Sequence, residues 1–363
     1  MKSNKALIVH TERSLGWGGQ EIRVLEELRG MQRMGFSAVL FAPCNSQIYK
    51  KTEAEGFPVF SVAFSSKIHL VTWLKLFKLI RRLKPMVINT HSSEDSWMAG
   101  LVARFLKVSL VIRTRHVSTP ISSTFSYRYF PHLILTTSEV IRKNLIQSGL
   151  DGRKIVSVPT GIDMGRFKFS YKNRSIIRDR FNVTEKDILV GNICVLRSWK
   201  GLDFFIDTVA SMPPHYKFII VGEGPQRQRL QSRAREMQLG NRLIFTGHQE
   251  HVEKFFSALD IFFFTSYAYE GIPQSLIQAI SIGLPLVICR TPSVIETLQN
   301  VDGFISIEYG DLEAACKALE QIRQWILRNK STMDFNRENI RTKYGLDSMM
   351  DTLLGLYRQY GVC

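Results

Sequence analysis

The stretch 265–290 contains the residues best suited to ligand binding or catalysis, at a predicted connection between a strand and a helix. The apolar residues 261–264 predict a buried strand, which runs into a polar loop ending at Glu270 and Gly271. Pro273 lies in the first turn of the predicted helix, where its missing N–H group removes no hydrogen bond. Unpaired N–H groups at a helix N-terminus, at the carboxyl end of a parallel strand, predict a site for an anion such as a phosphate.

Two polar side chains flank this predicted anion site. Glu270 stands just before the helix, and Gln278 lies eight residues further on, inside it. A carboxylate and an amide beside a phosphate suit the hydroxyl groups of a nucleotide sugar, because an amide can accept from one hydroxyl and donate to another. The alternative is an ordinary strand-loop-helix unit with a chance glutamate. The backbone of the predicted site is provided by Gly271, Ile272, Pro273, Gln274 and Ser275.

Two cations occupy an equivalent place earlier in the same half of the chain. The predicted strand 188–196 turns through Arg197 and Lys200 into a predicted helix at 202–212. Fixed cations at the carboxyl end of a strand can stabilise a leaving diphosphate. The alternative is that both side chains are solvated charges on a loop.

Glycine turns follow three other predicted strands. Gly18 and Gly19 lie between the first strand and its helix, where the backbone can approach a phosphate or a sugar closely. Gly222 opens a G-E-G-P turn, which lacks the third glycine of a dinucleotide fingerprint, and Gly247 with His248 ends another strand. Taken alone, the Gly18–Gly19 pattern is equally compatible with a tight turn.

Polar residues also end strands in the first half of the chain. The strand 110–115 runs into His116, and the strand 86–91 runs into a cluster that contains Glu94 and Asp95. Polar side chains at these ends of an α/β sheet are candidates for ligand binding. A single histidine is more often structural, and the two acidic residues could either bind acceptor hydroxyls or cap the helix that follows.

The stretch E-G-I-P-Q-S-L-I-Q, followed by A-I-S-I-G-L-P-L-V, resembles the signature of the family 4 retaining glycosyltransferases. That signature is a Glu, seven residues and a second Glu, leading into a helix of small residues. Glu270 matches the first position, and Gln278 stands in place of the second Glu. The glycine turn at 18–19, the basic pair Arg197 and Lys200, and the G-E-G-P turn resemble further motifs of the family, in the same order.

The resemblance implies an α/β protein of GT-B fold, with two doubly wound Rossmann-like domains facing across a cleft. An N-terminal, acceptor-side domain is expected at 1–165, with a C-terminal helix at about 341–363 packed back on it. A nucleotide-sugar-binding domain is expected at 166–340. The implied function is transfer of a sugar, with retention of configuration, from a nucleoside-diphosphate sugar to a glycan or lipid-linked acceptor in cell-surface polysaccharide or lipopolysaccharide synthesis.

The resemblance also assigns roles to residues. His116, Glu270, Arg197 and Lys200 match catalytic positions of the family, His116 being its cleft histidine. No D-x-D motif or metal-ligand spacing occurs, so we expect a nucleotide-sugar co-substrate with no metal and no other cofactor. The expected donor-binding residues are Gly18, Gly19, Arg197, Lys200, Gly222, Gly247, His248, Glu270, Gly271, Ile272, Pro273, Gln274, Ser275 and Gln278.

Composition agrees with a globular chain of two domains. The 363 residues are 45% hydrophobic and 22% charged, unlike a disordered protein. The five cysteines show no C-x-x-C or zinc spacing, and no apolar run is long enough to span a bilayer. A cytoplasmic location is expected, with peripheral binding to the inner face of the plasma membrane as an additional option.

The charge of the chain is uneven. The net charge is +16, and residues 1–165 hold 23 Lys+Arg against 11 Asp+Glu. A basic amphipathic helix is predicted from His69 to Leu83, which could lie on an anionic membrane or pack on the sheet with a solvated basic face. Nucleic acid is not the expected partner, because the basic residues do not interleave with exposed aromatic residues or form a known binding module.

Two other functions compete with the transferase. A sugar-nucleotide 2-epimerase of the same fold would need additional acid and base carboxylates in the cleft, and the sequence offers no obvious candidates. A catalytically degenerate binding subunit is favoured only by the replacement of the second signature Glu by Gln278.

Overall fold

The computed structural model describes residues 6–64, 70–328 and 335–362, with side chains from 338 onward in the last range. The chain divides into two compact units. Unit 1 comprises Met1–Gly161 and Leu346–Cys363, and unit 2 comprises Ile162–Gly345. The end of the chain therefore belongs to the same unit as its beginning, and each unit is described by itself below.

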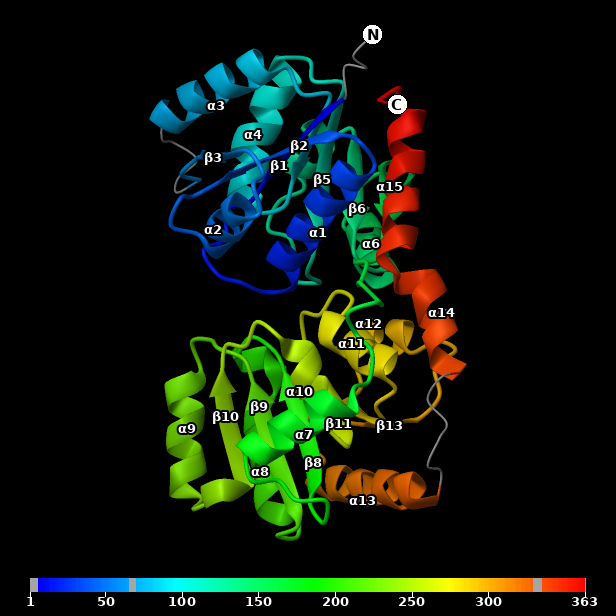
Figure 1. Ribbon diagram of the computed structural model, residues 1–363. Helices are drawn as coiled ribbons and strands as arrows, with labels where there is room; N and C mark the ends of the chain where they lie inside the picture. Colours follow the sequence, from blue (N-terminus) through cyan, green and yellow to red (C-terminus); the bar gives the residue numbers. More distant parts are fainter. Residues whose placement is uncertain (1–5, 65–69, 329–334, 363) are drawn as a thin grey trace. The chain divides into compact units, whose positions relative to one another are not determined.

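Unit 1 is built on a parallel sheet of seven strands in the order β3-β2-β1-β4-β5-β6-β7. Helices lie on both faces of this sheet, and α15, from the end of the chain, packs beside α1 (Figure 1). The strands are β1 (Leu7–Thr11), β2 (Ser37–Ala42), β3 (Val59–Ser61), β4 (Val87–Thr90), β5 (Leu110–Arg115), β6 (Leu133–Thr136) and β7 (Ile155–Ser157). The helices are α1 (Gly19–Arg33), α2 (Gln47–Ala54), α3 (Leu70–Leu83), α4 (Ser93–Phe105), α5 (Phe125–Tyr129), α6 (Glu139–Gln147) and α15 (Leu346–Gln359), with a 3-10 turn at Gly152–Lys154.

Unit 2 is built on a parallel sheet of six strands in the order β10-β9-β8-β11-β12-β13. The strands are β8 (Ile188–Ile193), β9 (Tyr216–Val221), β10 (Leu243–Gly247), β11 (Ile261–Phe264), β12 (Leu286–Cys289) and β13 (Phe304–Ile307). The helices are α7 (Tyr171–Arg180), α8 (Leu202–Ser211), α9 (Arg227–Glu236), α10 (Val252–Ala258), α11 (Gln274–Ile282), α12 (Pro292–Thr297), α13 (Leu312–Arg328) and α14 (Phe335–Tyr344), with 3-10 turns at Ser198–Lys200 and Gly240–Arg242.

Both sheets are buried on their two faces, as all-parallel sheets require. In β11, for example, Phe262 and Phe264 belong to one core cluster while Ile261 and Phe263 belong to the other. In each unit the strand order reverses beside a central strand, β1 in unit 1 and β8 in unit 2. The predicted pair of doubly wound parallel domains is therefore confirmed, and such reversal points are where open α/β sheets bind ligands.

The chain end completes the core of unit 1. Met349, Met350 and Leu353 of α15 are buried in the same cluster as Val24 and Leu28 of α1. Gly30 allows this close approach, since a Cβ atom at that position would lie 2.5 Å from Sδ of Met350. The unit therefore depends on residues from both ends of the sequence.

Several local expectations differ from the structure. The run 168–180, whose polar and basic composition favours a domain boundary, contains α7 of unit 2, in which Arg178 is buried with hydrogen bonds to Asp260 and three backbone carbonyls. Residues 117–131, whose Ser, Thr, Phe and Tyr content favours a loop, contain α5, which the buried Tyr127 anchors. The single expected helix at the chain end is two helices, α14 and α15, separated at Gly345.

Two smaller expectations also differ. Pro273 is the N-cap of α11 with extended backbone rather than its first helical residue. Cys194, which the predicted strand 188–196 would include, follows β8 and is half-buried, whereas Cys289 is buried in β12. The predicted helix start at His69 and the basic residues 1–5 lie outside the described part of the chain. No helix in that described part is both long and apolar enough to cross a bilayer.

Candidate functional site

The centre of the unit 2 site is an ion pair between two of the predicted residues. Nζ of Lys200 lies 2.6 Å from Oε1 of Glu270, with side-chain exposures of 16% and 10%. Lys200 ends the 3-10 turn that follows β8, and Glu270 ends the loop that follows the neighbouring strand β11. The two residues meet because adjacent parallel strands end at the same edge of the sheet.

The pair keeps Lys200 charged. Burial by itself lowers the pKa of the Lys200 ammonium group, but the Glu270 carboxylate raises it, and the net shift is upward. The nearby Cys194 thiol is shifted the other way, since burial raises its pKa to about 12 and keeps it protonated. The site therefore presents a permanent cation and an inert thiol.

The loops that carry Lys200 and Glu270 are fixed by backbone contacts. Oγ1 of Thr265 donates to the carbonyl of Lys200 at 2.8 Å, and Oγ of Ser293 donates to the carbonyl of Glu270 at 3.0 Å. Tyr269, just before Glu270, has φ +60, a conformation that is uncommon for a residue other than glycine.

The predicted anion-binding backbone lies directly after this pair. Gly271, Ile272 and Pro273 are buried, and α11 begins at Gln274. The first backbone N–H groups of such a helix have no partner within the helix and carry partial positive charge. Gln278, one turn into α11, is half-buried. Arg197 lies over the ring of Trp199, 5.1 Å from the ring centre.

The glycine turns of unit 2 pack against the loop after β8. A Cβ atom on Gly222 would lie 1.9 Å from the carbonyl oxygen of Cys194, so only glycine fits there. The Gly222 N–H donates to the carbonyl of Gly247, which is itself buried with φ +74. His248 follows and is exposed. These residues continue the same sheet edge toward β10.

The predicted residues of unit 1 lie at the carboxyl edge of its own sheet. Gly18 is the N-cap of α1, and its N–H donates to the Glu21 carboxylate at 2.8 Å. His116 follows β5 and is half-buried. Asp95, the third residue of α4, forms a capping box with the N-cap residue Ser92, and its carboxylate accepts from the N–H groups of His91 and Ser92. Glu94 instead pairs with Arg13 at 3.3 Å.

Sequence reasoning missed a buried polar cluster next to these residues. His116 contacts His91, which contacts His10, and His10 lies 3.8 Å from the Glu27 carboxylate. Glu27 is paired with Arg23 one helical turn earlier, and both side chains have 0% exposure. An available signal was the Arg–Glu pair at spacing four on the apolar face of the first helix, since buried charges need partners.

Two carboxyl groups beside this cluster, those of Glu12 and Asp95, have raised pKa values. Burial raises the pKa of Glu12 to about 8, and Asp95 adds to the rise. Burial also raises the pKa of Asp95 to about 7, despite its three hydrogen bonds. Glu12 joins the loops after β1 and β4, since it accepts hydrogen bonds from Gln20 at 2.6 Å and Ser92 at 2.8 Å.

One group of side chains in the described residues has spacing suitable for a metal ion. Single ligand atoms of His10, Glu27 and His91 lie within 4.8 Å of one another. However, the two imidazoles already contact each other at 3.0 Å, and Glu27 is engaged by Arg23 at 2.6 Å. A divalent ion would have to displace both interactions beside a buried guanidinium.

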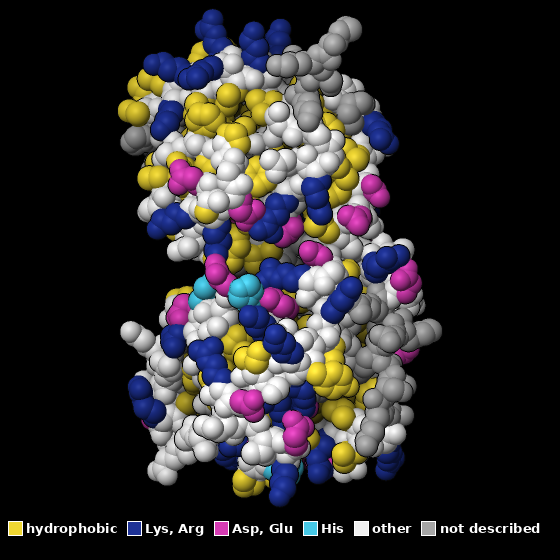
Figure 2. Space-filling model, viewed as in Figure 1, with side chains coloured by type: hydrophobic (Ala, Val, Ile, Leu, Met, Phe, Trp, Pro, Cys, Tyr) yellow, Lys and Arg dark blue, Asp and Glu magenta, His cyan; other side chains and the backbone are white. Residues whose placement is uncertain are grey.

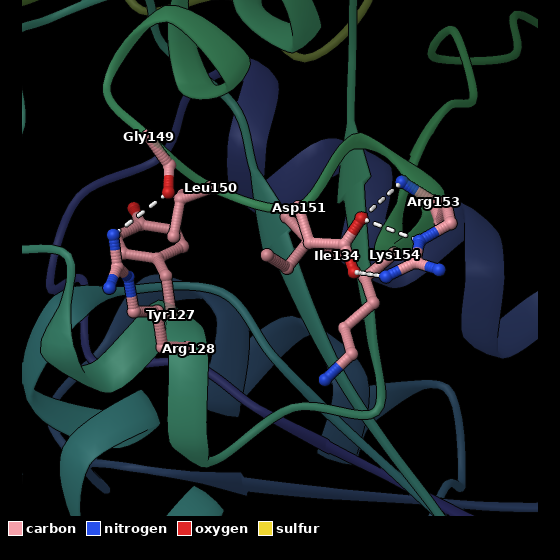
Figure 3. A pocket seen from close by; sticks show the side chains of 8 residues that line it. All are labelled: Tyr127, Arg128, Ile134, Gly149, Leu150, Asp151, Arg153 and Lys154. Atoms are coloured by element: carbon pink, nitrogen blue, oxygen red, sulfur yellow. Dashed lines mark hydrogen bonds and ion pairs between the residues drawn. The ribbon is translucent and has the colours of Figure 1, made fainter.

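A cavity of about 590 Å³ lies elsewhere in unit 1. Figure 3 shows its lining, which includes Tyr127, Arg128 and Lys154 and contains none of the predicted site residues. Arg153 pairs with Asp151 there, and Arg128 donates to the carbonyl of Gly149 at 2.9 Å. The cavity adjoins the starts of β6 and β7, whereas the candidate sites lie where strands end.

Both halves of the chain match known protein families. Residues 17–166 match the family "Glycosyltransferase Family 4", and residues 173–341 match "Glycosyl transferases group 1". The matches fall in this order along the chain and correspond to the two observed units.

The chain is a glycosyltransferase.

Its similarity to individual proteins extends over most of its length. This glycosyltransferase is 24% identical over 310 residues to the UDP-Gal:alpha-D-GlcNAc-diphosphoundecaprenol alpha-1,3-galactosyltransferase of Escherichia coli, covering 78% of each chain. The structure of Anabaena Alr3699/HepE in complex with UDP-glucose is similar with a TM-score of 0.88 at 17% identity, covering 97% and 99% of the two chains. The sucrose-phosphate synthase of Thermosynechococcus elongatus is similar with a TM-score of 0.78 at 16% identity, covering 98% and 99%. These likenesses confirm the GT-B fold expected from the sequence.

Proposed function

We propose that this glycosyltransferase moves a sugar from a nucleoside-diphosphate sugar, with retention of configuration and without a metal ion, to a lipid-linked or glycan acceptor. The observation that carries the proposal is the half-buried Lys200–Glu270 pair, whose Glu270 lies four residues before the first residue of α11. A permanent cation beside helix N–H groups suits a diphosphate leaving group, because both are fixed before the reaction starts.

The proposal gives each side of the pair a separate task. Lys200 and Arg197 neutralise the charge that develops on the leaving diphosphate, together with the backbone of residues 271–275. Glu270 positions Lys200 and accepts hydrogen bonds from donor-sugar hydroxyls, and Gln278 contacts hydroxyls of the nucleotide ribose. The glycine positions Gly222 and Gly247, with His248, border the base. In unit 1, the same proposal gives Gly18 and Gly19 a role in substrate binding and His116 a role in aligning the acceptor.

The relatives support a particular class of substrates. The E. coli relative is named for a UDP-galactose donor and a diphosphoundecaprenol-linked acceptor, and the Anabaena protein was solved with UDP-glucose. We therefore favour a UDP-hexose donor and a polyprenyl-diphosphate-linked sugar acceptor, in the synthesis of a surface polysaccharide.

A thermal-shift panel with UDP, GDP, ADP and CMP, followed by their sugar conjugates, tests the donor assignment. Selective stabilisation by UDP that persists with a chelator is expected, since a ligand bound only to the folded state raises the melting temperature. A transfer assay with UDP-hexoses and a short-chain polyprenyl-diphosphate sugar then tests the reaction. Folded protein that responds to no nucleotide would contradict the proposal and favour a degenerate binding subunit, whereas epimerised UDP-sugar without transfer would identify an epimerase.

We further propose that unit 1 reaches a lipid-linked acceptor by lying on an anionic membrane through α3. Thr72, Leu76 and Ile80 bury one face of this helix against unit 1, while Leu70 and Leu74 are 69% and 54% exposed. Four exposed cations accompany them: Lys75, Lys78, Arg81 and Arg82. Figure 2 shows dark blue and yellow side chains side by side in this part of unit 1. Exposed apolar residues flanked by cations suit an interfacial helix.

Vesicle sedimentation tests this surface. Binding to phosphatidylglycerol vesicles should weaken as salt is raised, because contacts between exposed charges are screened. The double variant Lys75→Ser/Lys78→Ser should bind less, whereas Lys168→Ser/Lys172→Ser, which changes two exposed lysines of unit 2, should bind like the wild type. An equal loss of vesicle binding in both variants, or binding that does not change with salt concentration, would contradict a role for α3.

A further inference from the structure

Three histidines of unit 1 form a continuous hydrogen-bonded row. Nδ1 of His10 lies 3.0 Å from Nε2 of His91, and Nδ1 of His91 lies 2.9 Å from Nε2 of His116. They are neighbours because β1, β4 and β5 are adjacent in the sheet and each histidine lies at the carboxyl end of its strand. His10 is fully buried, His91 is 5% exposed and His116 is half-buried. The row therefore runs from the interior toward the predicted ligand-binding edge.

All three rings are neutral at physiological pH. Burial lowers the pKa of His10 and lowers those of His91 and His116 well below the ordinary value, and the cations Arg23 and Arg115 add to the shift at His116. A neutral imidazole carries one N–H group and one acceptor nitrogen. Since each nitrogen pair shares one proton, the direction of one hydrogen bond in the row fixes the direction of the other.

Glu27 determines that direction. Its Oε2 lies 3.8 Å from Nδ1 of His10, and a carboxylate at this distance favours an N–H group over a lone pair on the facing nitrogen. The competing cation Arg23 is held by Glu27 at 2.6 Å and by the carbonyl of Val158 at 2.7 Å. His10 therefore donates from Nδ1 to His91, and His91 donates from its own Nδ1 to Nε2 of His116.

The far end of the row supports the same direction. Nε2 of His10 is buried and has no hydrogen-bond partner in the described part of the chain. If the row ran in the opposite direction, this nitrogen would carry a buried, unpaired N–H group. Orphaned buried donors are rarer and more costly than under-used acceptors, so an unprotonated Nε2 is favoured.

We propose that Glu27, acting through His10 and His91, holds His116 as the Nδ1–H tautomer, so that His116 offers a hydrogen-bond donor and not a base. No hydrogen bond to Nδ1 of His116 is formed within the described residues. Its partner would be an acceptor oxygen of the bound substrate, either a sugar hydroxyl or a phosphate oxygen. Only this last assignment depends on the proposed function, since the tautomer itself is a property of unit 1.

Long-range 15N–1H correlation spectra of the full-length protein, labelled in histidine, measure the tautomer directly at neutral pH. The resonances of His116 are identified by their loss in a His116→Ala variant. The expected pattern has the proton on Nδ1 of His116, the opposite of the form that a free histidine side chain favours. A proton on Nε2, a charged ring, or one equivalent of tightly bound zinc in the purified protein would each overturn the proposal.

Two variants of His91 connect the tautomer to turnover. His91→Asn keeps a donor near the position of Nδ1, whereas His91→Leu fills the space without one. The Leu variant is expected to move His116 toward the Nε2–H form. Its kcat should fall about tenfold, which is the scale of one lost hydrogen bond, with little change in the donor KM. The Asn variant should recover part of that loss. If the Asn and Leu variants were equally active and the His116 tautomer were unchanged in both, the proposal would be overturned.

The two proposals can fail separately. A correct tautomer in a protein that binds no nucleotide would leave the histidine row intact and refute the transferase chemistry. Selective UDP binding with His116 protonated at Nε2 would support the transferase and refute the proposed tautomer. The tautomer measurement on the wild type remains decisive even where a His91 variant does not fold.

Discussion

The most consequential contact at the residue scale is the Lys200–Glu270 pair. Both side chains are nearly buried, so removing either one leaves the other charge without a partner in a poorly solvated place. The pair also explains how a lysine can be fixed next to a helix N-terminus, where positive charge is otherwise unfavourable. Glu270 compensates for that repulsion.

Lys200→Ala should lower turnover about a hundredfold, the scale of losing one preorganised group that stabilises developing charge. Steady-state kinetics with saturating donor and acceptor measures this. Lys317→Ala, at an exposed position of α13, is the matched control and should behave like the wild type. Unchanged turnover in folded Lys200→Ala protein would remove Lys200 from the diphosphate site.

Gln278→Glu restores the more common family residue at a half-buried position of α11. If the side chain only binds ribose hydroxyls, activity should stay within about tenfold of the wild type, since one hydrogen bond is exchanged for another. Donor KM and kcat should be measured together. Abolished activity would show that the amide is required.

Glu12 should give unit 1 a distinctive pH dependence. Its pKa is raised to about 8, so the folded state keeps a proton that an unfolded carboxyl group has lost at neutral pH. The protonated Glu12 stabilises the folded state at low pH, and this stabilisation disappears as pH rises through the folded pKa. Asp95, with a pKa of about 7, changes the stability in the same direction. The buried histidines, whose pKa values are lowered, affect stability only below their ordinary value of 6.5.

Between about pH 6.5 and 8.5 the wild type should therefore lose roughly 2–3 kcal/mol of unfolding free energy, most of it through Glu12, and Glu12→Gln should show a flatter profile. Urea unfolding across this pH range provides the comparison. Parallel profiles for the two proteins would show that Glu12 is ionised in the folded state throughout.

At the scale of elements, glycines fix how the loops of unit 2 lie against each other. Gly201 links the Lys200 turn to α8 with φ +66, and a Cβ atom there would lie 2.1 Å from the carbonyl oxygen of Thr265. Because that oxygen belongs to the rigid backbone after β11, the loop with Lys200 would have to move away. The approach of the two loops, and so the ion pair, depends on this glycine.

Gly201→Ala should reduce turnover at least tenfold, while Gly240→Ala should not. Gly240 has a similar φ of +53 but no atom within 4 Å of the added Cβ. Both variants carry the cost of a left-handed alanine, roughly 1–2 kcal/mol, so a difference in activity reports the collision alone. Equal activities would mean that the loops can separate without affecting the site.

At the scale of the whole molecule, the chain returns to its starting unit through α15. Leu353 is fully buried in the core of unit 1, whereas its neighbour Leu354 is half-buried. Leu353→Ala should destabilise unit 1 by roughly 2–5 kcal/mol, and Leu354→Ala by much less. Hydrogen exchange that separates the two units would locate the loss. Similar effects of the two substitutions would contradict a structural role for α15 in unit 1.

The sequence by itself determined the fold class and placed most of the candidate donor-site residues at strand ends. Buried strands and glycine turns are local signals, and the motifs R-S-W-K-G, G-E-G-P and E-G-I-P-Q-S-L-I-Q follow one another in that order along the chain. These features are encoded within a few residues, so a strand end and the following helix N-terminus are placed together by chain connectivity alone. The helix within 168–180 was not predicted because its many polar residues also fit a linker. Burial of Arg178 is what distinguishes the helix from a linker.

What only the tertiary structure decided is which distant polar residues meet. His10 and His91 are separated by 81 residues, and Lys200 and Glu270 by 70. Their contacts depend on strand order, which places β1 beside β4 and β8 beside β11. Strand order is set by the packing of two whole hydrophobic cores, which no local spacing records. The ion pair and the row of histidines are therefore properties of the folded sheet edges, although every residue in them was present in the sequence.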